Sequence, residues 1–182
     1  ITSNLAAQTF THTGISFDPM TNAKAQWVDL NNDGWLDLLV SGKDNSSSNR
    51  VVIYTNNGDN TFTGNDLANL SEVAFDIGDY DLDGDIDILL AGRNSSNVRV
   101  CLVYQNNSGG SFSTQEFGLP GLSSGDLIWE DLDQDGDLEI FGSGLDDEGN
   151  EVVLFYMFEG GSYQKVAHPI DPVAYGAIKT FD

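Results

Sequence analysis

Three nine-residue segments of the chain place oxygen-bearing side chains at one fixed spacing. They begin at Asp29, Asp79 and Asp131, and each has Asp, Asn or Glu at positions one, three, five and nine, with Gly at position six. Carboxylates crowded into a short loop repel one another unless a cation lies between them. A hard divalent ion that takes six to eight oxygen ligands relieves this repulsion, and Ca²⁺ fits such a set best. The sequence therefore predicts three calcium sites.

The repeat extends beyond these acidic loops, which start 50 and then 52 residues apart. A short strand-like run precedes each loop, and an apolar run follows it over 36–42, 86–92 or 138–144. Near-continuous apolarity over so few residues predicts a strand covered on both faces. A polar turn, a third strand, a hairpin signal and a short edge strand complete each unit. Four antiparallel strands in about 50 residues are typical of propeller blades, so the predicted fold class is an all-β β-propeller.

The three copies predict a single domain over 1–182 that is a partial propeller. Propellers close with four to eight blades, so three blades are expected to belong to a longer protein or to be completed by a second copy. Unpaired edge strands at both ends make self-association through these edges an expected property. The expected parts are the last strand of a preceding blade (1–17), three blades (22–65, 72–116 and 124–167) and the first strand of a next blade (175–182).

The composition restricts the partners. The chain carries a formal net charge of −22, from 29 acidic against 7 basic residues, and thirteen of the acids lie in the three loops. Nucleic acids and anionic membranes attract basic surfaces, so neither is an expected partner. The longest apolar run, 152–158, is far shorter than the roughly 20 residues that cross a bilayer, so no membrane insertion is expected. Hydrophobic residues make up 40% of the chain, which favours a packed core over disorder.

The acidic loops, the glycine that ends the second strand and the pattern Val-x-x-Tyr-x-Asn-Asn-Gly from Val51 to Gly58 resemble FG-GAP/VCBS repeats. These are the blades of integrin-α-like β-propellers. The resemblance implies that each loop joins the first two strands of a blade and binds calcium. It implies side-chain ligands at Asp29, Asn31, Asp33 and Asp37, at Asp79, Asp81, Asp83 and Asp87, and at Asp131, Asp133, Asp135 and Glu139. Backbone carbonyls would come from Trp35, Asp85 and Asp137.

The competing interpretation of the loops is the EF-hand, which needs a bidentate Glu at position twelve and flanking helices. Position twelve is Val40, Leu90 or Gly142, and the flanking segments are strand-like, so this interpretation is rejected. Asn31 gives the first loop one carboxylate fewer, which predicts weaker binding there. Glu139 is one methylene longer than its counterparts and is expected to shift the geometry of the third site.

The residue types of common active sites are scarce. The chain has two His residues and one Cys, with no nucleophile elbow and no phosphate-binding loop. Cys101 is interpreted as a buried thiol within a strand. Trp27 and Trp129 occupy equivalent positions that are predicted to face the core. For Trp35, an exposed recognition role and a purely backbone role both remain open.

These observations favour a non-enzymatic module of the cell surface or extracellular space. The resemblance to integrin-like blades implies adhesion to, or recognition of, a protein or carbohydrate ligand, with calcium fixing the loops. Two alternatives remain open: a propeller module of a secreted polysaccharide-active enzyme, and a structural spacer in a large surface protein.

Overall fold

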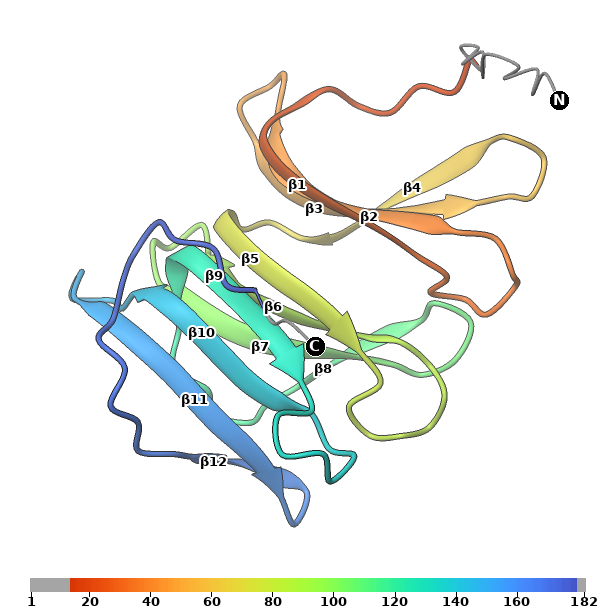
Figure 1. Cartoon of the computed structure of the whole chain (residues 1–182). Helices are drawn as coiled ribbons and strands as arrows, with labels where there is room; N and C mark the ends of the chain where they lie inside the picture. The colour runs from red at the N-terminus through yellow and green to blue at the C-terminus, as the bar shows by residue number, and fades with distance from the viewer. Residues whose placement is uncertain (1–13, 180–182) are drawn as a thin grey trace, which may run out of the picture.

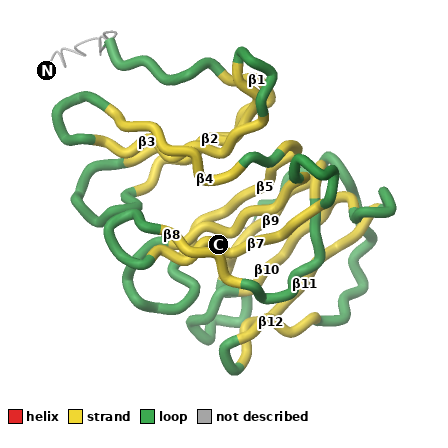
Figure 2. The backbone as a smooth tube through the Cα atoms, turned by 180° about the vertical axis from the view of Figure 1, so that it is seen from behind, coloured by secondary structure: helices red, strands yellow, loops and turns green. Residues whose placement is uncertain are grey.

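A computed structural model describes residues 14–179, and all the regular structure in this part of the chain is β-strand (Figures 1 and 2). The twelve strands follow one another with short connections, as the repeat pattern predicts. They are β1 (Met20–Val28), β2 (Asp37–Asp44), β3 (Asn49–Asn56), β4 (Phe62–Ala68), β5 (Ser71–Gly78), β6 (Asp87–Arg93), β7 (Arg99–Asn106), β8 (Phe112–Gln115), β9 (Ser123–Glu130), β10 (Glu139–Leu145), β11 (Glu151–Glu159) and β12 (Ser162–Lys165).

The strands form three four-stranded antiparallel sheets, β1-β2-β3-β4, β5-β6-β7-β8 and β9-β10-β11-β12, each in chain order. The all-β class and the four-stranded antiparallel unit are therefore confirmed. In Figure 1 the sheets follow one another as separate layers, and they do not close into a ring.

The apolar second strands of the sheets are covered on both faces, as their sequences predict. In β2, Leu39 packs in the core between the first and second sheets, whereas Leu38 and Val40 pack on the opposite face. In β6, Leu90 faces the first sheet and Leu89 faces the third. Successive residues of a strand point to opposite faces, so an uninterrupted apolar run supplies both cores at once.

Two cores join the three sheets. Val51 and Ile53 of the first sheet pack with Phe75 and Ile88 of the second. A second core contains Val103 of the second sheet together with buried residues of the third sheet, including Leu127, Ile140 and Leu154. Burial of apolar area at these two contacts is the main force that holds the layers together.

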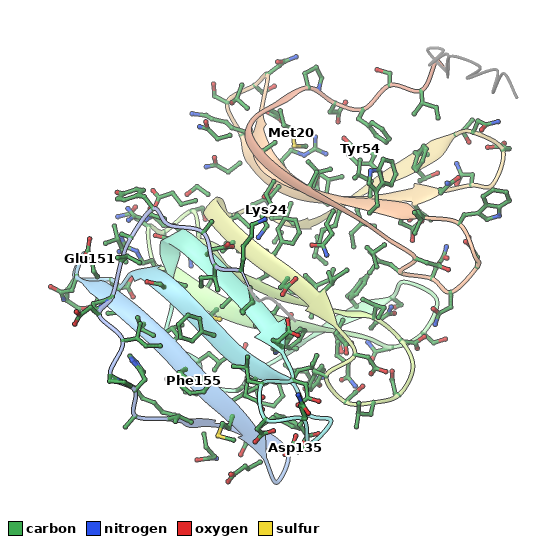
Figure 3. The ribbon with its side chains drawn as sticks, viewed as in Figure 1. Met20, Lys24, Tyr54, Asp135, Glu151 and Phe155 are labelled. Carbon is green, nitrogen blue, oxygen red and sulfur yellow. The ribbon has the colours of Figure 1, made fainter. Side chains whose placement is uncertain are left out.

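Lys24 of β1 also links the first strands of the sheets. Its Nζ donates hydrogen bonds to the carbonyl oxygen of Phe75 at 2.9 Å and to Oδ1 of Asp126 at 3.1 Å. Figure 3 shows Lys24 between the first sheet and the other two. The first strands of all three sheets therefore lie close together along one side of the layers.

The first strand of each sheet bends near its start, a feature that was not predicted from the sequence. Asn22, Glu72 and Ser124 have φ angles of 51°, 53° and 55°, a conformation that costs non-glycine residues energy. The pairing register of each sheet shifts at this point. Tyr175 has a φ of 58°, and its N–H donates to the Ser124 carbonyl at 2.6 Å. The bend is thus a property of the repeat.

The structure describes only parts of the two strands expected at the ends, 14–17 and 175–179. The strand expected over 1–17 lies mostly outside the described residues, and 14–17 form no strand. Of the strand expected over 175–182, residues 175–179 are not in a strand and 180–182 lie outside the described part. The N–H of Ile178 donates a hydrogen bond to the side chain of Asp126 at 3.0 Å. A β-strand would instead be held by a ladder of backbone–backbone hydrogen bonds.

Candidate metal centre

The three acidic loops join β1 to β2, β5 to β6 and β9 to β10, and they lie toward one edge of the molecule (Figure 1). The acid at position nine is in each case the first residue of the second strand. Asp37, Asp87 and Glu139 pair with the last residues of β1, β5 and β9. Because this pairing fixes the base of each loop, the eight residues between the paired residues form a closed turn.

Backbone amides hold the acid at position nine in place. Asp87 accepts from the N–H of Tyr80 at 3.1 Å and from the N–H of Asn106 at 2.8 Å. Asp37 accepts two equivalent bonds, and Glu139 accepts one from Leu132 at 2.7 Å. Burial raises the pKa of the Asp87 carboxyl to about 7 despite these bonds. It raises the pKa values of Asp37 and Glu139 in the same way.

The acid at position one shapes the turn. Asp79 accepts from the N–H of Asp83 at 3.0 Å and from the N–H of Gly84 at 2.9 Å. Asp29 and Asp131 make the corresponding bonds in their own loops. Gly84 has a φ of 92°, as the glycine at position six must when the chain turns back sharply.

Asp81, at position three of the second loop, lacks a partner for one oxygen. Its Oδ2 accepts a hydrogen bond from Nε2 of Gln105 at 2.5 Å, whereas Oδ1 is buried without a hydrogen-bond partner. Burial, followed by the neighbouring charge of Asp83, raises the pKa of the Asp81 carboxyl. A buried polar atom without a partner is unfavourable, and a water molecule or a cation at this place would satisfy it.

The structure gathers positions one, three and nine of two loops into compact groups. One carboxylate oxygen of each member lies within 4.8 Å of those of the others. This donor set consists of oxygen atoms alone, and together with the partnerless oxygen of Asp81 it fits a hard cation such as Ca²⁺. The two groups are Asp79, Asp81 and Asp87, and Asp131, Asp133 and Glu139.

The first loop has the same backbone but a weaker donor set. Asn31 stands at position three, and its Nδ2 donates to Oδ2 of Asp33 at 2.9 Å. The amide thereby satisfies one carboxylate without an ion, and one negative charge is absent. Weaker calcium binding at the first loop stays a prediction.

The structure does not bring positions five and seven into the compact groups. Oδ1 of Asp83 accepts from the N–H of Asp85 at 2.9 Å, and Asp33 and Asp135 make equivalent bonds. In the first loop, position seven is Trp35, and its side chain is 54% exposed. Its indole lies against Gly58, where a methyl group would come within 3.1 Å of Nε1. Asp137, at the same position of the third loop, has a backbone N–H that bonds to Asp135.

Amide side chains surround the loops, and their roles were not predicted from the sequence. Asn106 is fully buried and bonds to two loops, and Asn32 bonds from the first loop to the second. The available signal was the Asn-Asn pair, which occurs at 56–57 within the pattern from Val51 to Gly58 and again at 106–107. Cys101 is a buried thiol as expected, and burial raises its pKa to about 12.

A cavity of about 590 Å³ lies at the opposite ends of the first strands. Its lining includes the bent residues Asn22, Glu72, Ser124 and Tyr175. Glu72 accepts hydrogen bonds from the hydroxyls of Ser124 at 2.5 Å and Ser123 at 2.9 Å. These bonds lower the pKa of the Glu72 carboxyl. The cavity is thus separate from the acidic loops.

Repeated four-stranded antiparallel sheets, each with an acidic loop between its first two strands, define a class of all-β repeat proteins. A family model described as the FG-GAP-like repeat matches residues 29–90 and 79–142, and the chain belongs to this family. Comparisons with curated proteins and with solved structures give no match. Within residues 14–179, no helix has the length and apolar character needed to cross a membrane.

Proposed function

We propose that this chain is a calcium-stabilised recognition module in which three ions fix the loops between the first and second strands. The observation that carries the proposal is the buried Oδ1 of Asp81, which has no hydrogen-bond partner and belongs to a group of three converging carboxylates. A cation gives this atom its partner and cancels the repulsion among the acids.

The residues at positions one, three and nine would hold each ion. Bound calcium supplies positive charge and oxygen coordination, and its role at these loops is structural. Backbone amides of the chain orient the acidic ligands. Those of Tyr80 and Asn106 orient Asp87. Those of Asp83 and Gly84 orient Asp79. An ion that binds the folded state alone stabilises that state by linkage.

Recognition, rather than catalysis, is the proposed activity. Loops on a rigid β scaffold commonly carry binding sites, and FG-GAP-like repeats suggest an integrin-like module. The exposed indole of Trp35 offers one aromatic contact at the loop edge. We propose an extracellular or cell-surface location and an extracellular protein or carbohydrate ligand, consistent with the net charge of −22.

Isothermal titration calorimetry of the EDTA-treated protein with CaCl₂ tests the metal part of this proposal. We expect three sites per chain, and two in the Asp81→Ala variant, which removes the side-chain oxygens at position three. The matched control Asp66→Ala replaces an exposed acid outside the loops and should keep all three. Absence of calcium heat at millimolar concentrations would refute the proposal.

A glycan array and a pull-down with extracellular matrix proteins, each run with calcium and with EDTA, test the recognition part. We expect binding that EDTA abolishes. Hydrolysis of a polysaccharide by the calcium-loaded protein would instead support an enzymatic module.

A further inference from the structure

The first two acidic loops are joined by a buried amide. Asn106, the last residue of β7, donates from Nδ2 to the carbonyl of Leu30 in the first loop at 2.7 Å. The same nitrogen donates to the carbonyl of Ile86 at the end of the second loop at 3.2 Å. Its backbone N–H holds Asp87 at 2.8 Å, and the side chain is fully buried. One residue therefore contacts both loops and orients a proposed ligand of the second.

A second amide joins the same two loops at their exposed ends. Asn32, at position four of the first loop, donates from Nδ2 to Oδ1 of Asp85 at 2.6 Å. It also approaches the carbonyl of Gly84 at 3.3 Å. Asp85 and Gly84 are positions seven and six of the second loop, which an ion would fix. An ion that fixes the second loop therefore also fixes the two hydrogen-bond acceptors of Asn32.

The second and third loops are connected differently. Position four of the second loop is Leu82, an exposed apolar side chain that cannot donate a hydrogen bond. Phe158 stands in β11 where Asn106 stands in β7, and its ring packs edge-on against Tyr80 of the second loop at 5.9 Å. This contact is apolar and belongs to the core between the sheets. It adds stability without a directional bond to a loop carbonyl.

We propose that calcium binding at the first and second loops is positively coupled, that Asn32 and Asn106 are the positioning residues that carry the coupling, and that the third loop binds independently. This inference rests on the proposed calcium-binding function. Binding at the second loop fixes the acceptors of Asn32, so the first loop loses less conformational entropy when it binds its own ion.

Charge acts in the opposite direction. An ion in one loop lowers the negative potential at the other and weakens the second binding event through space. At 0.15 M salt the screening length is about 8 Å, which reduces this effect between exposed loops. Direct hydrogen bonds are not removed by screening, so the coupling should persist at this ionic strength.

The glycines at position six allow each site to be followed separately. The amides of Gly34, Gly84 and Gly136 bond to the first acid of their own loops at 2.8, 2.9 and 3.1 Å. The ¹⁵N-labelled, EDTA-treated chain is titrated with CaCl₂ at 0.15 M KCl and followed by NMR. The signal of each glycine amide then gives the calcium concentration at which its own loop is half-saturated. Asp81→Ala removes the side-chain oxygens at position three and disables the second site, and Asp133→Ala disables the third as the control. We expect Asp81→Ala to raise the half-saturation concentration at Gly34 about fivefold, and Asp133→Ala to leave it unchanged.

Asn32→Gly then tests the connection itself. Asn32 and Gln134 occupy position four with φ angles of 56° and 64°, so glycine fits both, and Gln134→Gly is the matched control. With Asn32→Gly present, Asp81→Ala should change the value at Gly34 by less than about twofold, whereas with Gln134→Gly the change should stay near fivefold. Equal effects of the two site-disabling variants, or no effect of Asp81→Ala, would overturn the coupling while leaving calcium binding intact. Glycine amides that do not respond to calcium in any variant would overturn calcium binding together with the coupling.

Discussion

Asn106 donates a hydrogen bond of 2.7 Å to the backbone carbonyl of Leu30, although the two residues are 76 positions apart and belong to different sheets. Asn56 occupies the same place in the first repeat, and its Nδ2 donates to Leu36 within its own loop at 3.2 Å. Asn106 makes the equivalent bond to Ile86 of its own repeat and adds the bond to the first repeat, which Asn56 has no counterpart for. Burial differs as well, because Asn106 is fully buried and Asn56 is not.

Replacement of Asn106 by Leu should destabilise the calcium-free protein. The change leaves the carbonyls of Leu30 and Ile86 without their buried donor, which costs about 3 kcal/mol. Asn56→Leu is the matched control and should cost about 1 kcal/mol, because water can replace the lost bond there. Urea denaturation in EDTA measures both. Equal losses would contradict the role assigned to the bond between the sheets.

Removal of calcium should lower the melting temperature substantially. An ion at a thousand times its dissociation constant stabilises the folded state by about 4 kcal/mol per site. For a chain of this size, 1 kcal/mol corresponds to roughly 2–4 °C, so even one saturated site raises the melting temperature by about 10 °C. Differential scanning calorimetry measures the melting temperature in 5 mM CaCl₂, in 5 mM MgCl₂ and in EDTA. An identical curve in all three solutions would rule out a stabilising metal.

Asp87 makes the stability of the calcium-free protein depend on pH. Burial raises its pKa from 3.8 in the unfolded chain to about 7, so the folded protein holds the proton more tightly. The contribution of Asp87 to stability is therefore largest below about pH 4 and is lost as the pH rises to about 7. Denaturation in EDTA from pH 4 to 8 should show this loss in the wild type relative to Asp87→Asn. Parallel pH profiles of the two proteins would contradict the shift.

Calcium should reverse this dependence, because the ion must displace the proton from Asp87. We expect calcium affinity at the second loop to fall as the pH is lowered from 8 to 5.5. The NMR signal of the Gly84 amide in a calcium titration measures this affinity at each pH. An affinity that does not change over this range would mean that the Asp87 carboxyl is not a ligand.

Asn31→Asp should tighten the first site by about tenfold, since it restores the carboxylate that the other loops carry at position three. The same change should lower calcium-free stability, because the new charge faces Asp33 where an amide hydrogen bond of 2.9 Å stood. Calcium titration followed at Gly34 and denaturation in EDTA measure the two effects. A tighter site without any loss of calcium-free stability would show that Asn31 does not stabilise the empty loop.

The repeat made most of the fold predictable. Three copies of one pattern gave the four-stranded sheets and the loops, because alternation of apolar residues and turn signals are local properties of the chain. Contacts between sheets are not local, and for that reason the roles of Asn32 and Asn106 were missed. The bends at Glu72 and its equivalents were missed for a related reason, since no glycine marks these positive φ angles.

Equivalent positions in a repeat do not guarantee equal burial, and Trp27 and Trp129 show this. Both were predicted to face the core. Trp129 is 4% exposed, stacks on Tyr80 at 5.5 Å and donates from Nε1 to the hydroxyl of Tyr163 at 2.8 Å. Trp27 is 52% exposed, so the prediction is wrong for it. The reason is that Trp129 faces the second sheet, whereas the corresponding face of the first sheet meets no other sheet within residues 14–179.

Trp129→Ala should therefore cost about 3–5 kcal/mol, and Trp27→Ala about 1 kcal/mol. Urea denaturation of dilute protein measures the difference, and acrylamide quenching of Trp27→Phe and Trp129→Phe variants shows which indole is accessible. A large cost of Trp27→Ala that grows with protein concentration would mean that a second copy covers this face in solution. Sedimentation equilibrium would then detect the associated species, and Trp27→Ala would disperse it. Equal costs that do not depend on concentration would contradict the burial described for the two residues.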